Sequence, residues 1–425
     1  MSKITRVWSR EILDSRAMPT VETVLQLDNG VTTVASVPSG ASTGKNEALE
    51  LRDGDQARYL GKGVLKAVDN VNNKIGPAIV GIDPSNQADM DKKLIELDGS
   101  NNKSNLGANA ILSVSIANCK AGAIANNLPV YKWVYQLSTA QGAATEGIPT
   151  RVPTPIYNMI NGGAHGAGNL DFQEFQIIPA SSKPYSLALK TGAEVYQHLK
   201  NSLIKIGAIH SVGDEGGYAP NLFNNADALG INVEAINSAG FQIGQDFFLG
   251  LDVAASHFYK DGSYSIKDRS NSLNSGSLTS FFEDLSKEYR LILLEDPLQE
   301  EDWSGWTEVT SKLGDHMMIV GDDLIVTNPE RVKKAAQSKA CNTALIKPNQ
   351  IGTVSETLEV IKLARQFGWK IIVSHRSGET NDFFIADFAV GVKSDFVKFG
   401  APARGERVAK YNRLLSIETE LSANK

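Results

Sequence analysis

The stretch Leu291-Ile-Leu-Leu-Glu295 begins a segment, continuing to Gly400, in which short apolar runs end abruptly in a charged or polar residue. Including one earlier run, Phe247-Phe-Leu-Gly-Leu, these terminal residues are Asp252, Glu295, Asp322, Lys347, His375-Arg376-Ser377 and Lys398. Helix-like stretches separate most of the runs, and this alternation implies parallel strands joined by helical crossovers. In a closed βα-barrel the C-terminal ends of the strands meet at one mouth. We therefore expect these residues to form one site.

Length and composition set the class of protein. The chain has 425 residues, which is too long for one ordinary core, so we expect two domains. A net charge of -6 argues against a nucleic-acid or anionic-membrane partner. The N-terminus lacks the apolar run of a secretory signal. The sequence also contains no run of about 18 apolar residues, so we expect no membrane-spanning helix. The two cysteines, Cys119 and Cys341, lie in apolar contexts. Buried thiols in a reducing cytoplasm are the expectation.

The first third of the chain is predicted to be an α+β domain. Residues 21–37 alternate imperfectly around Asn29-Gly30, which predicts a hairpin. Residues 62–97 and 107–126 predict helices, and the second is small or apolar on most faces and therefore buried.

The rest of the chain is predicted to be a second domain. The segment 137–155 is rich in Ser, Thr, Ala, Gly and Pro, which is typical of a boundary. It divides the chain into domains 1–136 and 137–425. Residues 184–205 predict a helix, and residues 405–421 predict an amphipathic closing helix.

A loop of small residues, Pro38-Ser-Gly-Ala-Ser-Thr-Gly44, follows the hairpin and suits mobility or close backbone approach. Its glycines and Lys45 invite comparison with a phosphate-binding P-loop. However, the spacing from Gly40 to Gly44 is one residue short, and Asn46 replaces the Ser or Thr that would bind magnesium. The P-loop interpretation is rejected.

Asp252, Glu295 and Asp322 are candidate metal ligands. If they converge at about 4 Å, each pair repels by about 4 kcal/mol at an effective dielectric constant of about 20. A divalent cation relieves this repulsion, and an all-oxygen ligand set suits magnesium. Alternatively, each carboxylate caps a helix or pairs with a surface cation. Their recurrence at strand ends favours the metal.

Two lysines and two further carboxylates are candidate proton carriers. Burial and a nearby metal would lower the pKa of Lys347 or Lys398 and make it a general base, although each would also suit a structural ion pair. A shielded Glu174 or Glu215 would stay protonated and act as an acid, although loop hydrogen bonding is the alternative.

The remaining candidates would contact a substrate. Arg376 offers a planar fork for phosphate or carboxylate, and Ser377 a hydroxyl. His165, beside Gly162-Gly163, is either a structural loop residue or a substrate contact. Taken together, the candidates predict metal-assisted proton abstraction next to a carboxylate, with an anion clamp.

From Arg10 to Asn412, nearly the whole chain resembles the enolase family. The motifs are PSGASTG at 38–44, GDEGG at 213–217, EDP at 295–297, GDDLIVTNP at 321–329, KPNQIGT at 347–353 and SHRSGET at 374–380. The resemblance implies an α/β protein with an N-terminal α+β domain and a TIM-barrel-like C-terminal domain. The opening strands and helices of this barrel would depart from simple alternation. It implies a hydro-lyase that reversibly dehydrates 2-phosphoglycerate to phosphoenolpyruvate in glycolysis and gluconeogenesis.

The resemblance also implies two Mg²⁺ ions per site. Asp252, Glu295 and Asp322 match the ligands of the first ion, and Ser42 matches a ligand of the second, which binds with the substrate phosphate. The other matching positions are Lys347 (base at C2), Glu215 (acid for the C3 hydroxide) with Glu174 beside it, Lys398 (facing the substrate carboxylate), Arg376 and Ser377 (phosphate clamp), and His165 and His375 (substrate contacts).

The chain departs from the family pattern at Ala17-Met18 (usually Gly-Asn), His257 (usually Glu) and Phe399 (usually Thr). A homodimer or higher oligomer is expected from the family. Its usual interchain ion pairs from Arg10 and Glu22 are weakened here, because Ser416 and Thr419 replace the charged partners. Exposed ion pairs contribute only about 0–1 kcal/mol each, so their loss need not dissolve a dimer.

Two other functions compete with this interpretation. One is a superfamily relative that acts on a non-phosphorylated acid, which Arg376, Ser377 and the Ser42 loop disfavour. The other is a catalytically silent scaffold, which predicts losses among Lys347, Glu215 or the carboxylates, and none occur.

Overall fold

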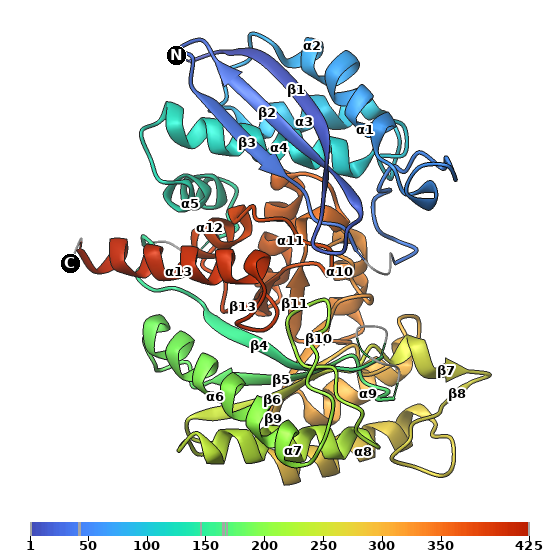
Figure 1. Cartoon of the computed structure of the whole chain (residues 1–425). Helices are drawn as coiled ribbons and strands as arrows, with labels where there is room; N and C mark the ends of the chain where they lie inside the picture. The colour runs from blue at the N-terminus through green and yellow to red at the C-terminus, as the bar shows by residue number, and fades with distance from the viewer. Residues whose placement is uncertain (1, 41–43, 145–146, 164–165, 167–168, 424–425) are drawn as a thin grey trace.

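The computed structural model describes residues 2–40, 44–144, 147–163, 166 and 169–423. An N-terminal α+β domain lies above a barrel in the view of Figure 1. Its sheet has the order β1-β2-β3, with β1 at Ile4–Leu13, β2 at Pro19–Leu27 and β3 at Thr32–Ser36, all antiparallel. The predicted hairpin is confirmed. Strand β1 was not predicted, because its polar residues do not alternate regularly with its apolar ones.

The helical half of this domain is more broken than predicted. Instead of one helix over 62–97, the chain forms α1, a π-helical turn, α2 and α3. Their bounds are Tyr59–Gly61 for a preceding 3₁₀ turn, Leu65–Asn70 for α1, Val71–Ile75 for the π turn, Gly76–Ile79 for α2 and Gln87–Asp98 for α3. The break before α3 contains Gly81, whose φ of +86° is left-handed. Helices α4 (Ala108–Ala125) and α5 (Val130–Ala140) complete the domain.

Helix α4 forms the centre of the N-terminal domain. By length and composition alone it would cross a membrane, yet 83% of it is buried inside the protein. It packs against β2, β3, α3 and α5. Such burial is typical of a core helix, and it confirms the prediction that residues 107–126 form a buried helix.

The second domain is a closed barrel with strand order β10-β11-β12-β13-β4-β5-β6-β9. These strands are β4 (Thr154–Asn161), β5 (Glu174–Pro179), β6 (Phe247–Asp252), β9 (Leu291–Glu295), β10 (Met318–Gly321), β11 (Thr343–Ile346), β12 (Lys370–Ser374) and β13 (Phe396–Lys398). The helices outside the barrel are α6 (Tyr185–Lys205), α7 (Asn225–Ser238), α8 (Ser275–Tyr289), α9 (Trp303–Leu313), α10 (Pro329–Gln337), α11 (Val354–Gln366), α12 (Phe384–Gly391) and α13 (Gly405–Ala423). Short elements are the 3₁₀ turns Ala255–Phe258 and Pro348–Gln350 and the hairpin of β7 (Tyr259–Lys260) and β8 (Ser263–Tyr264).

Strand β5 runs against the other barrel strands. It pairs antiparallel with both β4 and β6, whereas the remaining pairs are parallel. The first residue of β5, Glu174, therefore lies opposite Asp252, the last residue of β6. The reversal brings a carboxylate from the start of one strand to the rim where the other strands end.

The barrel interior is filled by apolar side chains below that rim. They are Ile156, Ile178, Leu293, Met318, Val320, Leu345, Ile372 and Phe396. Strand β6 contributes Gly250, where a Cβ atom would come within 2.8 Å of Gln176 Oε1 and 3.2 Å of Leu293 Cβ. The filled interior fixes the strand ends relative to one another.

The turn between β1 and β2 carries backbone strain at Ala17, whose φ is +58°. The left-handed conformation costs a non-glycine residue about 1–2 kcal/mol. We expect Ala17→Gly to raise the free energy of unfolding by up to about 1 kcal/mol, because the greater freedom of unfolded glycine offsets part of the relief. A urea titration measures this change. Ala57→Gly, at an exposed turn position without positive φ, should instead lower stability. Equal effects of the two substitutions would contradict the strain argument.

Candidate active site

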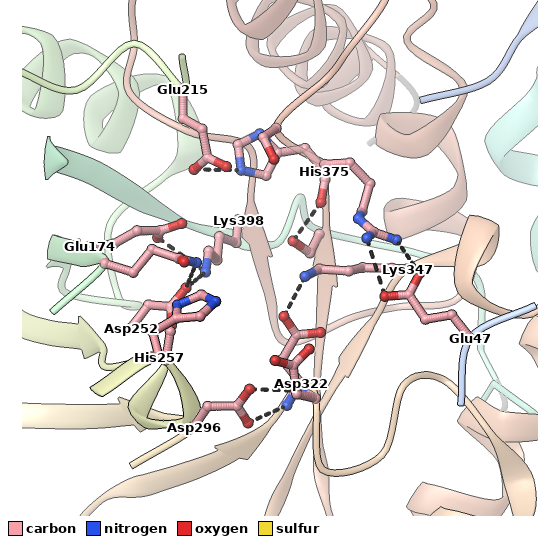
Figure 2. Close-up of a pocket in the computed structure, with 16 residues that line it drawn as sticks. Glu47, Glu174, Glu215, Asp252, His257, Asp296, Asp322, Lys347, His375 and Lys398 are labelled. Atoms are coloured by element: carbon pink, nitrogen blue, oxygen red, sulfur yellow. Dashed lines mark hydrogen bonds and ion pairs between the residues drawn. The ribbon is translucent and has the colours of Figure 1, made fainter. Parts of the chain in front are cut away.

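The side chains predicted from the strand ends meet at one rim of the barrel, and all of them except Glu295 are drawn among the residues that line its cavity (Figure 2). They surround a cavity of about 40 Å³, which has room for only a few water molecules. Lys347, Arg376 and Lys398 pair with carboxylates of Asp322, Glu47 and Glu295 around this cavity. The charged side chains of the rim are therefore paired with one another.

Lys398 is the centre of one carboxylate cluster. Its Nζ lies 3.1 Å from Glu174 Oε2, 3.0 Å from Asp252 Oδ2 and 2.8 Å from Glu295 Oε2. Burial lowers the pKa of Lys398, but the three carboxylates outweigh burial and raise it well above its usual value. This arrangement therefore favours the charged form of Lys398.

Lys347 pairs with Asp322 across the ends of β11 and β10. Asp322 also accepts a hydrogen bond from Gln350 Nε2 at 3.1 Å. Burial lowers the pKa of Lys347, but Asp322 outweighs it, so the pKa is raised. In this arrangement the ion pair with Asp322 opposes the lowering that the sequence predicted from burial and a nearby metal ion, and it is the structural ion pair that the sequence left as the alternative.

Glu215 and His375 form a second buried group. Glu215 Oε2 accepts from Asn158 Nδ2 at 3.0 Å and lies 3.4 Å from His375 Nε2.

Burial, together with the neighbouring Glu215 and Asp252, raises the pKa of Glu174 well above its usual value despite Lys398. This shift favours the protonated form of Glu174, which is the form a general acid needs.

Arg376 points its guanidinium at the N-terminal domain. Its two terminal nitrogens lie 3.0 and 3.3 Å from the carboxylate oxygens of Glu47, and Nη1 donates to Asn349 Oδ1 at 3.1 Å. The Glu47 partner was missed by the sequence reasoning, because it follows a loop and ends no apolar run. Ser377 lines the same cavity.

Asp296 was also missed, although it lies within the EDP motif. Its carboxylate accepts the backbone N–H groups of Asp322 at 3.0 Å and Asp323 at 2.8 Å. It thereby fixes the turn after β10 to the end of β9 (Figure 2). Its position directly after a strand end was the signal that could have identified it.

The donor set at this rim fits a divalent cation. Burial first, and then repulsion from Asp252 and Asp322, raise the pKa of Glu295 well above its usual value, although Lys398 opposes them. Added positive charge relieves such repulsion, and oxygen donors suit Mg²⁺. In the described part of the chain, the groups compact enough to share one ion are Glu174/Glu215/His375 and Asp296/Asp322/Asp323. Asp252 and Glu295 instead meet at Lys398, so the predicted triad is divided between two lysines.

Two predicted residues, Ser42 and His165, lie outside the described residues. Of the departures from the family pattern, His257 lines the rim cavity, and Phe399 is fully buried with its ring centroid 6.1 Å from that of Tyr411. Phe399 is therefore a core residue beneath the rim.

The residues tied to the expected dimer have partners within this chain. Arg10 Nε donates to Glu22 Oε1 at 2.7 Å across β1 and β2. Ser416 Oγ lies 3.4 Å from Glu420 Oε1, and Thr419 Oγ1 donates to the backbone of Leu415. Oligomerisation stays a prediction.

Two family models match the chain. Residues 4–134 match "Enolase, N-terminal domain", and residues 149–425 match "Enolase, C-terminal TIM barrel domain". The two matches follow the order of the α+β domain and the barrel.

Proposed function

This chain belongs to the enolase family, lyases of the enolase superfamily, and we propose that it is a phosphopyruvate hydratase. The reaction is the reversible dehydration of 2-phosphoglycerate to phosphoenolpyruvate, in glycolysis and gluconeogenesis. The observation that supports it best is the joint placement of Lys347, Glu215 and Arg376 around one rim cavity. A base, an acid and an anion fork are the parts that this dehydration needs.

The chemistry divides between two side chains. Lys347 Nζ takes the proton from C2, and the electron pair of that C–H bond forms the double bond to C3. Glu215 gives a proton to the C3 hydroxyl, so the C3–O bond breaks and water leaves. A lysine or histidine base working with one or two magnesium ions is the known pattern of this superfamily, so the choice of base follows family membership.

The proposal includes two Mg²⁺ ions, the first held by Asp252, Glu295 and Asp322 and the second by Ser42 with the substrate. Bound Mg²⁺ would supply positive charge that stabilises the dianionic form of the substrate. Lys347 must be neutral to act as a base. When the Asp322 charge is compensated, burial and Arg376 remain as causes that lower the Lys347 pKa. Lys347 then loses its ammonium proton more readily.

Substrate binding falls to the remaining rim residues. Arg376 and Ser377 clamp the phosphate, and Lys398 faces the substrate carboxylate, with Glu174 beside the acid. His165 and His375 complete the contacts. Without substrate, Arg376 and Lys398 pair with carboxylates of the protein. When substrate binds, each of these cations must therefore give up a carboxylate partner and pair with a substrate anion.

The deciding experiment follows ultraviolet absorbance when purified protein meets 2-phosphoglycerate with and without Mg²⁺. A Mg²⁺-dependent rise is expected, since the product is an enol phosphate with a conjugated double bond. A flat trace from folded, metal-loaded protein would reject the proposal. Turnover of a non-phosphorylated acid in the same preparation would then identify a superfamily relative with another substrate.

Glu47 competes with anions for Arg376. Replacing Glu47 with Gln should raise the affinity for inorganic phosphate about tenfold or more, since a hydrogen bond to a charged group contributes about 1.5–3 kcal/mol. Calorimetric titration with phosphate measures the affinity. Asn349→Ala removes a neutral acceptor from the same guanidinium and should change phosphate affinity far less. Unchanged affinity in Glu47→Gln would show that phosphate does not displace Glu47.

We further propose that the protein acts in the cytoplasm as a homodimer or higher oligomer. Family membership supports the oligomer, and the buried free thiols of Cys119 and Cys341 support a reducing compartment. Light scattering on purified protein gives the mass that tests the oligomer.

A further inference from the structure

Arg407, in α13, is fully buried directly behind the rim. Its Nη1 donates to the carbonyl of Arg376 at 2.6 Å and lies 2.7 Å from His375 Nδ1. Its Nη2 donates to the carbonyls of Ser377 at 2.6 Å and Asp214 at 3.1 Å. One guanidinium thus joins the two loops that carry His375 and Glu215, and no motif singled it out from the sequence.

The contact with His375 determines which ring nitrogen carries the proton. A guanidinium has only donors, so His375 Nδ1 must be the acceptor in this 2.7 Å contact. In a neutral imidazole the other nitrogen then carries hydrogen. That nitrogen, Nε2, lies 3.4 Å from Glu215 Oε2. The imidazole therefore presents a donor to Glu215.

The charges around His375 keep it neutral. The groups that face it are Arg407 from α13, Lys398 from β13 and Glu215 from the 213–217 loop. Burial, then Arg407 and Lys398, lower the pKa of His375 to about 3, against the opposing effect of Glu215. A doubly protonated ring, which would have no acceptor for Arg407, is thereby disfavoured at neutral pH.

Close packing at Gly400 fixes the positions of Glu215, His375 and Arg407 relative to one another. A Cβ atom there would lie 2.5 Å from the Glu215 carbonyl oxygen, 3.0 Å from His375 Cε1 and 3.2 Å from Arg407 Cδ. The φ of Gly400 is +82°. The imidazole is packed against this backbone, so its hydrogen-bond partners and not free rotation set its orientation.

We propose that Arg407 is a positioning residue that fixes His375 as the Nε2–H tautomer, so that the ring turns an N–H towards Glu215 and cannot accept the Glu215 proton. Glu215 Oε2 accepts a hydrogen bond from Asn158 Nδ2 at 3.0 Å, and His375 Nε2 faces the same oxygen from 3.4 Å. The acid proton of Glu215 is kept away from the histidine and available to a leaving hydroxide. This consequence for catalysis rests on the proposed function, whereas the tautomer does not.

Nitrogen NMR of protein labelled with ¹⁵N in its histidine rings tests the tautomer without substrate. His375→Gln identifies the signals. We expect an unprotonated Nδ1 and a protonated Nε2 that do not titrate between about pH 5 and pH 8. A protonated Nδ1 in the wild-type protein would overturn the proposal, whatever the activity of the enzyme.

Variants separate Arg407 from a general structural role. Arg407→Met should give a mixture of tautomers and lower kcat about 10–100-fold, with a smaller change in KM. Arg407→Lys retains a cationic donor and should restore the Nε2–H form. The matched control is Arg404→Met, because Arg404 also joins loops, through Ser15 and Gly213 carbonyls, without touching His375. An unchanged tautomer in Arg407→Met would contradict the proposal, and if that variant fails to fold, loss of the Nε2–H form in folded Arg407→Lys would do so.

Discussion

Replacing Lys347 with alanine is expected to slow conversion of 2-phosphoglycerate by about 10²–10⁴-fold or more, the usual contribution of a positioned general base. The side chain comes from the end of β11, contacts Asp322 and lines the rim cavity. Arg376 and Ser377 remain in the variant, so binding of the phosphate should change less than kcat. The absorbance assay gives kcat, and exchange of the C2 hydrogen with deuterated water isolates the proton-transfer step.

Loss of a buried lysine also removes an ion pair, and a control must separate this effect. Lys103 is similarly buried and pairs with Glu356 at 2.8 Å, away from the rim residues. Lys103→Ala should lower the free energy of unfolding and leave turnover of the folded protein near wild type. If Lys347→Ala still exchanged the C2 hydrogen at the wild-type rate, another group would be the base.

Replacing Lys398 with methionine is expected to lower the free energy of unfolding by about 3–5 kcal/mol near neutral pH. The Lys398 side chain is 4% exposed, and its ammonium group is held between Glu174, Asp252 and Glu295. Methionine fills similar volume but leaves three buried carboxylates without their shared cation. Without this cation, each carboxyl group must either stay charged without compensation or bind a proton, and either outcome lowers the stability of the folded protein.

This loss should depend on pH in a definite direction. The folded-state pKa values of Glu174 and Glu295 are already raised by burial, and removing Lys398 raises them further. Unfolded glutamate titrates near pH 4.3, so between about that pH and the folded pKa the folded variant binds more protons than the unfolded chain. The two folded proteins bind different numbers of protons only between the wild-type folded pKa values and the higher values of the variant, so their difference in stability should be small near pH 4 and grow as the pH rises through that window. Urea titrations at several pH values measure it.

Added Mg²⁺ should restore part of the lost stability, because the ion replaces positive charge near the same carboxylates and binds only the folded chain. Lys120→Met provides a comparison, since Lys120 pairs with Asp382 at 2.7 Å outside the rim. That variant should lose stability with no gain specific to Mg²⁺. A Lys398→Met protein as stable as wild type at pH 8, with or without Mg²⁺, would refute the cluster as described.

The main features of the fold could be predicted from sequence because they depend on local patterns. Apolar runs of strand length end in the residues that the barrel collects at its rim, from Asp252 on β6 to Lys398 on β13. The hairpin and the buried helix α4 follow from turn chemistry and from small apolar composition. Prediction was weaker at β1 and the broken helices α1 to α3, where the residue pattern is irregular and packing decides the backbone.

The sequence by itself determined which residues reach the rim, because a side chain at the end of a parallel strand is carried there by the backbone. Only the tertiary structure decided which residues they meet. Glu47 on Arg376, Asp296 beneath Asp322, Arg407 behind His375 and the divided carboxylates around two lysines join segments distant in the chain. The protonation states of the rim residues depend on these contacts. Burial and a nearby metal ion predicted a lowered pKa for Lys347, whereas in this arrangement the adjacent Asp322 raises it, since electrostatic energy depends on distance in space and not on separation along the sequence.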